Sequence, residues 1–339
     1  MRNKLSVILV IMIALSVSLS AVEVTKTGTT AAGFLNIDVG ARAVGMGGAF
    51  VSVANDISAM YWNSAGVARL TAPQAVFTHT KWIADINFNY AAIAVPLPGV
   101  GTLGANATFL TMDEMERTTI ANPDGTGETF NAGSYAFGLC YARNLTDKFS
   151  IGFNFKYISE EIYNSKATGM AFDIGTLFTT QFNGLTIGMN ISNYGTKMQM
   201  GGRDMLIQTD IDPMVSGNNA NINANLKTDA YDLPLMFRVG IAMDLLKGAG
   251  GSNLLLAVDA LHPNDDVESL NVGTEYILHN MFSLRAGYAS LFAEDQEGGL
   301  SVGGGLKYQV GTTALALDYA WRDFGLLKEV QMFTVGLQF

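Results

Sequence analysis

Hydrophobic and polar positions alternate along most of this chain with a period of two residues. In residues 150–157, for example, Ile151, Phe153, Phe155 and Tyr157 share one face, and small or polar residues share the other. Such alternation is typical of β-strands whose two faces meet different surroundings. Fourteen segments are predicted as strands, at approximately residues 74–82, 86–96, 100–112, 131–142, 148–159, 166–179, 184–193, 231–244, 252–262, 267–279, 281–291, 299–308, 312–322 and 328–339.

These strands indicate a barrel in the outer membrane, although a soluble β-sandwich could show some of the same alternation. Hydrophobic residues make up 49% of the chain, yet after the N-terminal region they never form a run long enough for a membrane-spanning helix. Long connections, at 113–130 and 194–230, fall largely on the opposite end from short ones such as 97–99. The last strand ends in Phe339, which also favours an antiparallel outer-membrane β-barrel of fourteen strands.

The N-terminus has the pattern of a signal peptide. Arg2 and Lys4 precede an apolar run over residues 5–15, and small residues follow up to Ser20. A membrane anchor is the alternative, but the run is shorter than the roughly 20 residues that a spanning helix needs. We therefore expect residues 1–20 to be removed before Ala21 and the protein to be exported to the outer membrane of a Gram-negative-type envelope.

Composition limits the possible chemistry. The net charge of −10 argues against nucleic-acid binding through phosphates, and the single Cys140 excludes an internal disulfide. His79, His262 and His279 lie on different predicted strands or at strand ends, without metal-ligand spacing. No nucleophile-elbow or zinc-protease motif occurs. We expect no catalytic residue, no metal, no cofactor and no enzymatic activity.

Charged residues are predicted on the inner face of most strands from the fifth onward. They are Lys156, Asp173, Arg238, Asp259, Glu275, Arg285, Lys307 and Asp318. They could line a transport path or hold a ligand, or they could pair with one another beside a plug. The second interpretation is favoured because an unpaired buried charge is costly. The many inward glycines and alanines indicate that another segment fills the lumen.

The segment before the first strand is the predicted filler, so we divide the chain into a plug at residues 21–72 and a barrel at residues 73–339. Gly45, Gly47 and Gly48 lack the spacing and the Lys-Ser/Thr pair of a phosphate-binding loop. Asp56 is expected to cap a short helix over residues 57–62, and residues 63–66 are expected to end it.

The plug also carries a resemblance. Residues 40–50 read G-A-R-A-V-G-M-G-G-A-F and residues 55–66 read N-D-I-S-A-M-Y-W-N-S-A-G. This pattern resembles the N-terminal signature of PorV/PorQ-type outer-membrane proteins, which are similar to FadL-like fourteen-stranded barrels. The resemblance implies a lumenal hatch seated by Asp56, Trp62, Asn63 and Gly66. Ser64 stands where the signature has proline, which puts its rigid turn in doubt.

Three functions are compatible with these features. The PorV/PorQ resemblance implies protein export or surface attachment related to type IX secretion, with exported proteins or secretion components docking at external loops such as 194–230. A FadL-like transporter is the alternative, with a hydrophobic ligand in a lumen walled by Phe34, Phe50, Met60 and Trp62. A structural or porin-like barrel is the third, although a plugged and charged lumen argues against a wide pore. Outer-membrane lipid is an expected partner in each case.

Overall fold

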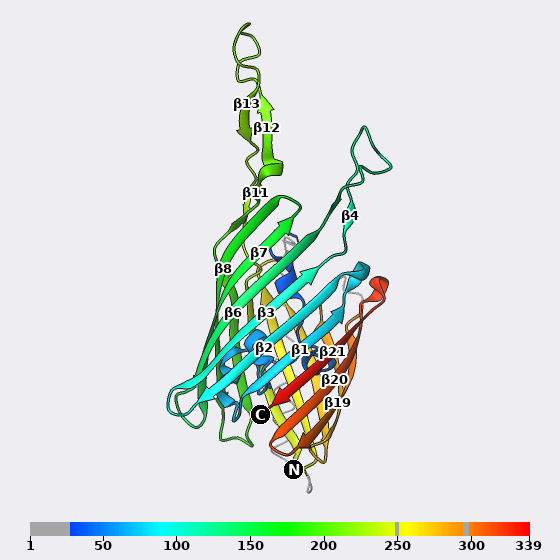
Figure 1. Ribbon diagram of the computed structural model, residues 1–339. Helices are drawn as coiled ribbons and strands as arrows, with labels where there is room; N and C mark the ends of the chain where they lie inside the picture. Colours follow the sequence, from blue (N-terminus) through cyan, green and yellow to red (C-terminus); the bar gives the residue numbers. More distant parts are fainter. Residues whose placement is uncertain (1–27, 248–250, 294–297) are drawn as a thin grey trace.

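The protein is a closed antiparallel β-barrel of fourteen long strands (Figure 1). The computed structural model describes residues 28–247, 251–293 and 298–339. Pairing of β1 with β21 and of β8 with β9 closes the barrel. Its strands are β1 Gln74–Lys81, β2 Asn87–Leu97, β3 Gly101–Thr111, β6 Ala132–Asn144, β7 Phe149–Ile162, β8 Ser165–Thr179, β9 Thr186–Gly195, β15 Met236–Lys247, β16 Asn253–Pro263, β17 Ser269–Leu278, β18 Phe282–Leu291, β19 Leu300–Val310, β20 Thr313–Asp323 and β21 Glu329–Gln338.

All fourteen predicted strands are therefore confirmed, with one substantial change of boundary. The eighth was expected to begin at residue 231, but β15 begins at Met236. Pro234 explains the shift, because proline has no backbone N–H to donate to a neighbouring strand. Tyr231 belongs instead to the short strand β14 (Ala230–Tyr231), which pairs with β10 (Met198–Gln199). The predicted signal peptide lies outside the described residues.

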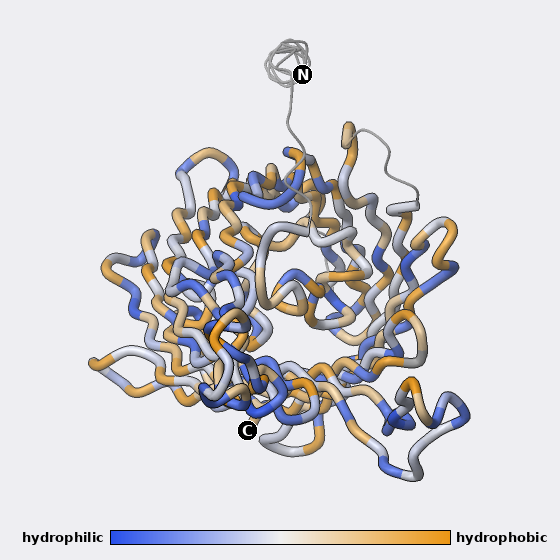
Figure 2. The backbone as a smooth tube through the Cα atoms, turned by 90° about the horizontal axis from the view of Figure 1, so that it is seen from above, coloured by the Kyte–Doolittle hydropathy of each residue, from blue (hydrophilic) through white to orange (hydrophobic). Residues whose placement is uncertain are grey.

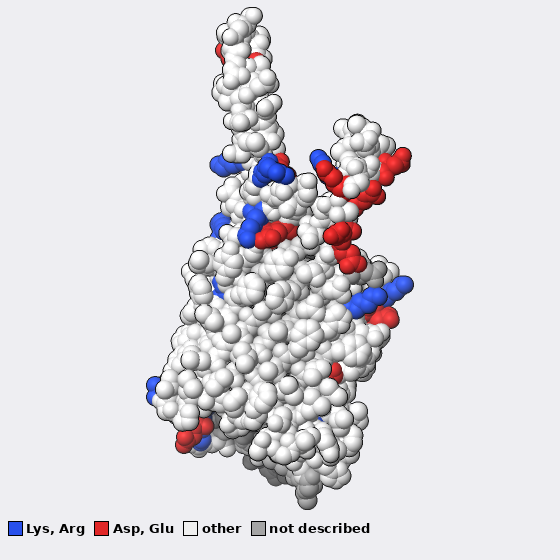
Figure 3. Space-filling view, viewed as in Figure 1, with Lys and Arg blue, Asp and Glu red and all other residues white. Residues whose placement is uncertain are grey.

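The outer surface of the barrel is apolar. Side chains such as Phe77, Leu139, Leu284 and Phe333 are each more than half exposed. Figure 3 shows a broad band without charged side chains around the middle of the visible face. An apolar band flanked by polar ends is the surface expected where lipid replaces water. Separately, no helix among the described residues is long and apolar enough to span a membrane.

The two ends of the barrel differ in the length of their connections (Figure 1). One end has short turns, whereas the other carries a flap with β4 (Met115–Glu116) and β5 (Thr129–Phe130) and a projecting hairpin of β12 (Leu206–Thr209) and β13 (Ile222–Asn225). The strip β11 (Gly201–Gly202) extends the sheet beside β8. In outer-membrane barrels the long loops face outward and the short turns face the periplasm. The two ends are named accordingly the outer end and the periplasmic end.

One aromatic residue at the outer end departs from the expected girdle. The sequence places Trp82 and Trp321 at the outer ends of their strands, which predicts that both belong to a girdle of interfacial aromatic residues. Trp321 shares its strand face with the lipid-exposed Leu317 and Tyr319. Trp82 does not belong to a girdle. Its ring packs edge-on against that of Phe324, with the ring centroids 5.2 Å apart, and against the hydrophobic core. The reason is parity: Trp82 follows the buried Thr80 by two residues and shares its inward face.

Residues 28–72, hereafter the lumenal segment, run through the interior of the barrel (Figure 2). The segment enters beside the outer end, where the Ala31 N–H donates to the Asp232 carbonyl at 2.9 Å, and ends at the periplasmic end, where Pro73 accepts from the Phe339 N–H. It contains η1 Gly33–Asn36, α2 Ala41–Gly45, α3 Ala59–Trp62 and η2 Ser64–Arg69. Further short 3₁₀ turns, η3 Ile83–Asp85, η4 Arg203–Met205 and η5 Gly325–Leu327, lie in the loops.

The barrel wall is shaped to receive this segment. A Cβ atom on Gly152 would lie 2.3 Å from the Ser64 carbonyl carbon, and one on Gly287 would lie 2.2 Å from that of Met46. Gly188 and Gly273 face the lumenal backbone equally closely. These inward glycines let the backbone of the segment lie directly against the strands, so the core of the molecule is the interior of the barrel.

Candidate functional site

A network of ion pairs joins the lumenal segment to the wall of the barrel. Arg42 projects from α2 and forms a two-point contact with Glu275 on β17, at 2.9 Å from Nε and 2.7 Å from Nη2. Its Nη1 donates to Asp56 at 2.8 Å. On the wall, Arg285 contacts Glu275 at 2.7 Å and Asp318 at 2.6 Å. Five charged side chains from the segment and from three strands therefore form one connected unit.

Arg42 joins the carboxylate of the lumenal segment, Asp56, to that of the wall, Glu275. Burial alone would lower the pKa of its guanidinium, but the carboxylates of Glu275 and Asp56 outweigh that effect, so the pKa lies above the ordinary value. The side chain therefore stays charged. Because Glu275 is buried, loss of Arg42 would leave its carboxylate with Arg285 as its remaining cationic partner.

The other predicted lumenal charges separate into paired and unpaired ones. Lys156 pairs with Asp173 at 2.8 Å and also donates to Asn193. Asp259 receives hydrogen bonds from the backbone N–H groups of Phe50 and Val51, at 2.6 and 2.7 Å. The prediction that the lumenal charges pair with one another is thus correct for Lys156, Asp173, Glu275, Arg285 and Asp318.

Of the cations predicted in the lumen, two have no carboxylate partner among the described residues. Arg238 is buried, lies over the rings of Tyr61 and Trp62, and donates to the Ser192 hydroxyl at 3.3 Å. Lys307 is exposed near the periplasmic end and contacts the Gln338 side-chain oxygen at 3.4 Å. The expected mutual pairing is wrong for these two side chains and for Asp259. For Arg238 and Asp259, aromatic faces and backbone groups of the lumenal segment take the place of ionic partners.

Asn63 anchors the C-terminal part of the lumenal segment. Its side-chain amide donates to the carbonyls of Val51 and Thr176, and its side-chain oxygen accepts the Ala65 N–H. Gly66 packs against the Ala54 carbonyl, where a Cβ would lie at 2.2 Å. Residues 63–66 were expected to end a helix, and α3 does end at Trp62. The 3₁₀ helix η2 begins directly afterwards at Ser64, because Asn63 satisfies the first turn of the new helix.

Asp56 acts differently from the predicted helix cap. One carboxylate oxygen accepts the N–H and the hydroxyl of Ser58, at 2.9 and 2.5 Å, and the other contacts Arg42. The helix α3 starts only at Ala59, with Ser58 at its N-cap. Trp62 is buried and donates from its indole nitrogen to the Val39 carbonyl at 2.8 Å.

The three glycines of the first motif provide close packing. Gly47 and Gly48 have positive φ angles of 66° and 74°, which side chains rarely adopt. A Cβ on Gly47 would lie 2.6 Å from the backbone of Tyr288, and one on Gly45 would lie 3.1 Å from Gly303. The motif thus brings the backbone at α2 against β18 and β19.

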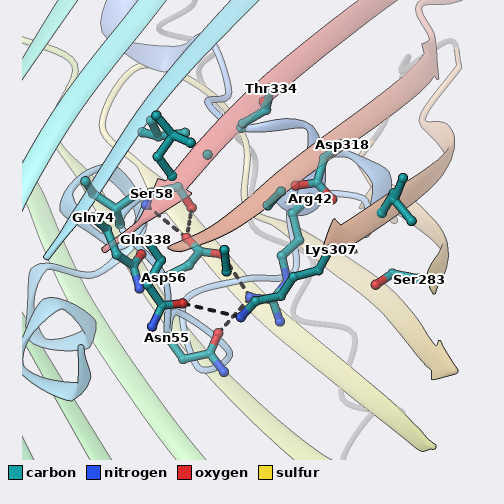
Figure 4. Close-up of a pocket in the computed structure, with 18 of the residues that line it drawn as sticks. Arg42, Asn55, Asp56, Ser58, Gln74, Ser283, Lys307, Asp318, Thr334 and Gln338 are labelled. Carbon is teal, nitrogen blue, oxygen red and sulfur yellow. Dashed lines mark hydrogen bonds and ion pairs between the residues drawn. The ribbon is translucent and has the colours of Figure 1, made fainter. Parts of the chain in front are cut away.

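Two sizeable cavities lined by described residues lie inside the barrel, one on each side of α2. The outer cavity measures about 420 Å³ and is lined by Asp38, Trp82, Arg238, Arg322 and Phe324, among others. The periplasmic cavity measures about 520 Å³, and Figure 4 shows Arg42, Asp56, Lys307 and Asp318 around it. Both cavities combine apolar surface with ionic side chains. An ion pair of 2.5 Å between Asp38 and Arg322 lies at the outer cavity.

The apolar pocket predicted beside the hatch is not open. Phe34, Phe50, Met60 and Trp62 are all buried within the hydrophobic core. A void of only about 20 Å³ remains beside Phe34 and Met60. The four side chains fill the space that they were expected to enclose, because they pack against one another and against the wall.

Sequence reasoning missed Arg42, Asp38 and Arg322. A signal for Arg42 was present, since it is the one charged residue in the glycine-rich motif at residues 40–50. An arginine among small and apolar residues indicates a specific buried partner. Among the described residues there is also no cluster of three or more His, Cys, Asp or Glu side chains able to hold a metal ion.

Comparison with solved structures defines the class of this barrel. The fold is similar to the toluene transporter TodX of Pseudomonas putida, with a TM-score of 0.54, 12% identity and coverage of 88% of this chain and 96% of that one. It is similar to the toluene transporter TbuX of Ralstonia pickettii, with a TM-score of 0.52, 10% identity and coverage of 88% and 97%. It is also similar to the monoaromatic hydrocarbon channel CymD, with a TM-score of 0.53, 10% identity and coverage of 89% of this chain and 96% of that one. The protein therefore has the fold of FadL-like outer-membrane barrels.

The family follows from the sequence. Residues 10–229 match the uncharacterised protein family UPF0164, and this chain belongs to that family. No curated protein matches the sequence. At such low identity the solved structures show the fold alone. The expected FadL-like architecture is confirmed, whereas neither the family match nor the three similar barrels support the PorV/PorQ resemblance.

Proposed function

We propose that this protein is a gated outer-membrane channel for small molecules with a hydrophobic body. The observation that carries the proposal is a closed barrel in which one lumenal segment separates an outer cavity from a periplasmic one. The fold is shared with TodX, TbuX and CymD, which are described as transporters or channels for toluene and other monoaromatic hydrocarbons. Cavities of this size exceed the roughly 150 Å³ that suffices to hold benzene in a protein core.

Transport requires the lumenal segment to move or its side chains to rearrange. The segment fills the middle of the lumen, where Val39, Phe50 and Asn63 are fully buried. It is also held by separate polar contacts, those of Arg42 and Asn63 among them. A segment held by a limited set of contacts can have two positions, whereas the hydrogen-bonded wall has one.

A disulfide that ties α2 to β21 should stop uptake. The Ala41 backbone nitrogen lies 2.9 Å from the Thr334 hydroxyl oxygen, so cysteines at these positions are placed to approach bonding range. In a Cys140→Ala background, Ala41→Cys/Thr334→Cys should abolish accumulation of ¹⁴C-toluene by host cells that contain an oxygenase trap. Reduction should restore the rate, and each single cysteine serves as control. Unimpaired uptake by the cross-linked protein would contradict gating by the lumenal segment.

A second candidate function is docking of a protein at the outer surface, as the PorV/PorQ resemblance implied. The observation that favours it is the β12–β13 hairpin, which projects far beyond the barrel in Figure 1. Ile211 and Met214, in the loop between its two strands, are more than half exposed. Replacing residues 206–225 with a short Gly-Ser linker should abolish capture of such a partner and leave toluene uptake unchanged. Loss of uptake in this variant would tie the hairpin to transport instead.

A further inference from the structure

The lumenal segment seals the barrel in two different ways. Against β17 and β18, the backbone of the lumenal segment lies directly on the glycines of the wall. Cβ atoms on Gly273 and Gly287 would lie 2.2 Å from backbone atoms of Met46. Against β7 and β9, the backbones of Ser64 and Val51 lie equally close to Gly152 and Gly188. Opening any of these contacts requires the main chain to move.

Against β20 and β21 the seal consists of side chains. Ala41 and Val44 from α2 meet Ala320 and Met332 from the wall in a small hydrophobic cluster that is separate from the main core. None of the four is more than 3% exposed. We call these four residues the septum. Methionine has a flexible, unbranched side chain, so rotation of Met332 can widen the septum with a smaller movement of the backbone than the glycine contacts require.

The septum lies between the two cavities. On β21, Met332 lines the outer cavity, and Thr334, two residues further on the same face, lines the periplasmic one. On β20, Arg322 lines the outer cavity, Asp318 the periplasmic one, and the fully buried Ala320 lies between them. On both strands the barrier is therefore about the thickness of one layer of side chains.

We infer that the septum is the gate of a permeation route that joins the two cavities between α2 and the β20–β21 wall. This inference rests on the proposed function and assigns it a path. A short apolar constriction between two wetted cavities excludes water and ions while it is closed. It admits an apolar group when a side chain turns aside.

The flanking charges define the class of solute. The Arg322–Asp38 pair lies on the outer side of the septum, and the Asp318–Arg285 pair lies on the periplasmic side. A charged solute would have to desolvate in the septum and compete with both pairs. A pure hydrocarbon would displace water from these charged groups without replacing its hydrogen bonds. A neutral amphipathic molecule, such as a phenol, satisfies both environments.

The test measures initial accumulation of ¹⁴C-p-cresol and ¹⁴C-toluene by host cells containing an oxygenase that traps both. Met332→Ala should raise the rate several-fold, and Met332→Trp should lower it at least about tenfold, because the constriction sets the flux. Val44→Trp, from the other side of the septum, should act like Met332→Trp. Phe333→Trp is the matched control, since Phe333 is the next residue but points to lipid with 52% of its surface exposed.

Folding of each variant is checked by heat-modifiable migration in gels. A rate unchanged by Met332→Trp and Val44→Trp, together with a block by the Ala41–Thr334 disulfide, would place the route elsewhere and leave the proposed function standing. Wild-type uptake equal to that of cells without the protein would reject both. Wild-type uptake of toluene as fast as that of p-cresol would overturn the amphipathic solute class.

Discussion

Replacing Arg42 with methionine is expected to release the lumenal segment from the wall while the barrel stays folded. The substitution keeps much of the apolar stem but removes the contacts to Glu275, Asp56 and Asn55. Breaking a buried ion pair from one side costs about 3–5 kcal/mol, and the lower end applies because Arg285 still faces Glu275. A loss of about 3 kcal/mol increases the displaced population roughly a hundredfold.

The measurable result is a leak. Host cells expressing Arg42→Met should become more sensitive to vancomycin, a bulky antibiotic that an intact outer membrane excludes. Arg117→Met is the matched control, because Arg117 and Glu128 form an exposed ion pair on the outer flap, where such pairs contribute little. Gel migration of the unheated protein should be that of a closed barrel in both variants. Unchanged vancomycin sensitivity in Arg42→Met would show that this network does not hold the segment in place.

The barrel could be predicted from sequence because the alternation that marks each strand lies within a short stretch of chain. A strand in lipid must alternate, so segments such as residues 150–157 identify themselves without knowledge of their neighbours. Parity also placed Glu275 and Arg285 on the inner face, where the structure has them. The early start expected for β15 failed because the pattern was followed past Pro234, whose effect on hydrogen bonding is equally local.

The site could be predicted only in part because its contacts are not local. Arg42 and Glu275 are separated by 233 residues, and nothing in either neighbourhood specifies the other. The same limitation explains why a pocket was expected around Phe50 and Trp62, whereas the structure has that space filled. Apolar residues near a hatch can enclose a space or fill it, and the difference depends on how closely opposing strands approach. That distance is determined by the wall glycines, whose role appears only in three dimensions.

Those glycines lead to a second prediction with a large effect. Gly152→Ala should displace η2 from β7, because the new methyl group would lie 2.3 Å from the Ser64 carbonyl and 2.5 Å from the Ala65 nitrogen. Overpacking of this kind costs about 1–3 kcal/mol where side chains can yield. Here the obstructing atoms are backbone, so the segment itself must move. Hydrogen exchange in peptides covering residues 59–69 should accelerate by at least about tenfold, since each 1.4 kcal/mol corresponds to a factor of ten.

Gly304→Ala provides the control. It introduces the same methyl group into another strand, but the nearest atom would lie 3.8 Å away, which is ordinary contact. Exchange in the lumenal segment should then match that of the wild type, and exchange in the strands should be slow in both variants. If Gly152→Ala instead accelerated exchange in β7 and β8 and left residues 59–69 protected, the segment would be the rigid element and the wall would yield. Gating would then have to begin in the barrel, and the Ala41–Thr334 cross-link would no longer be expected to block it.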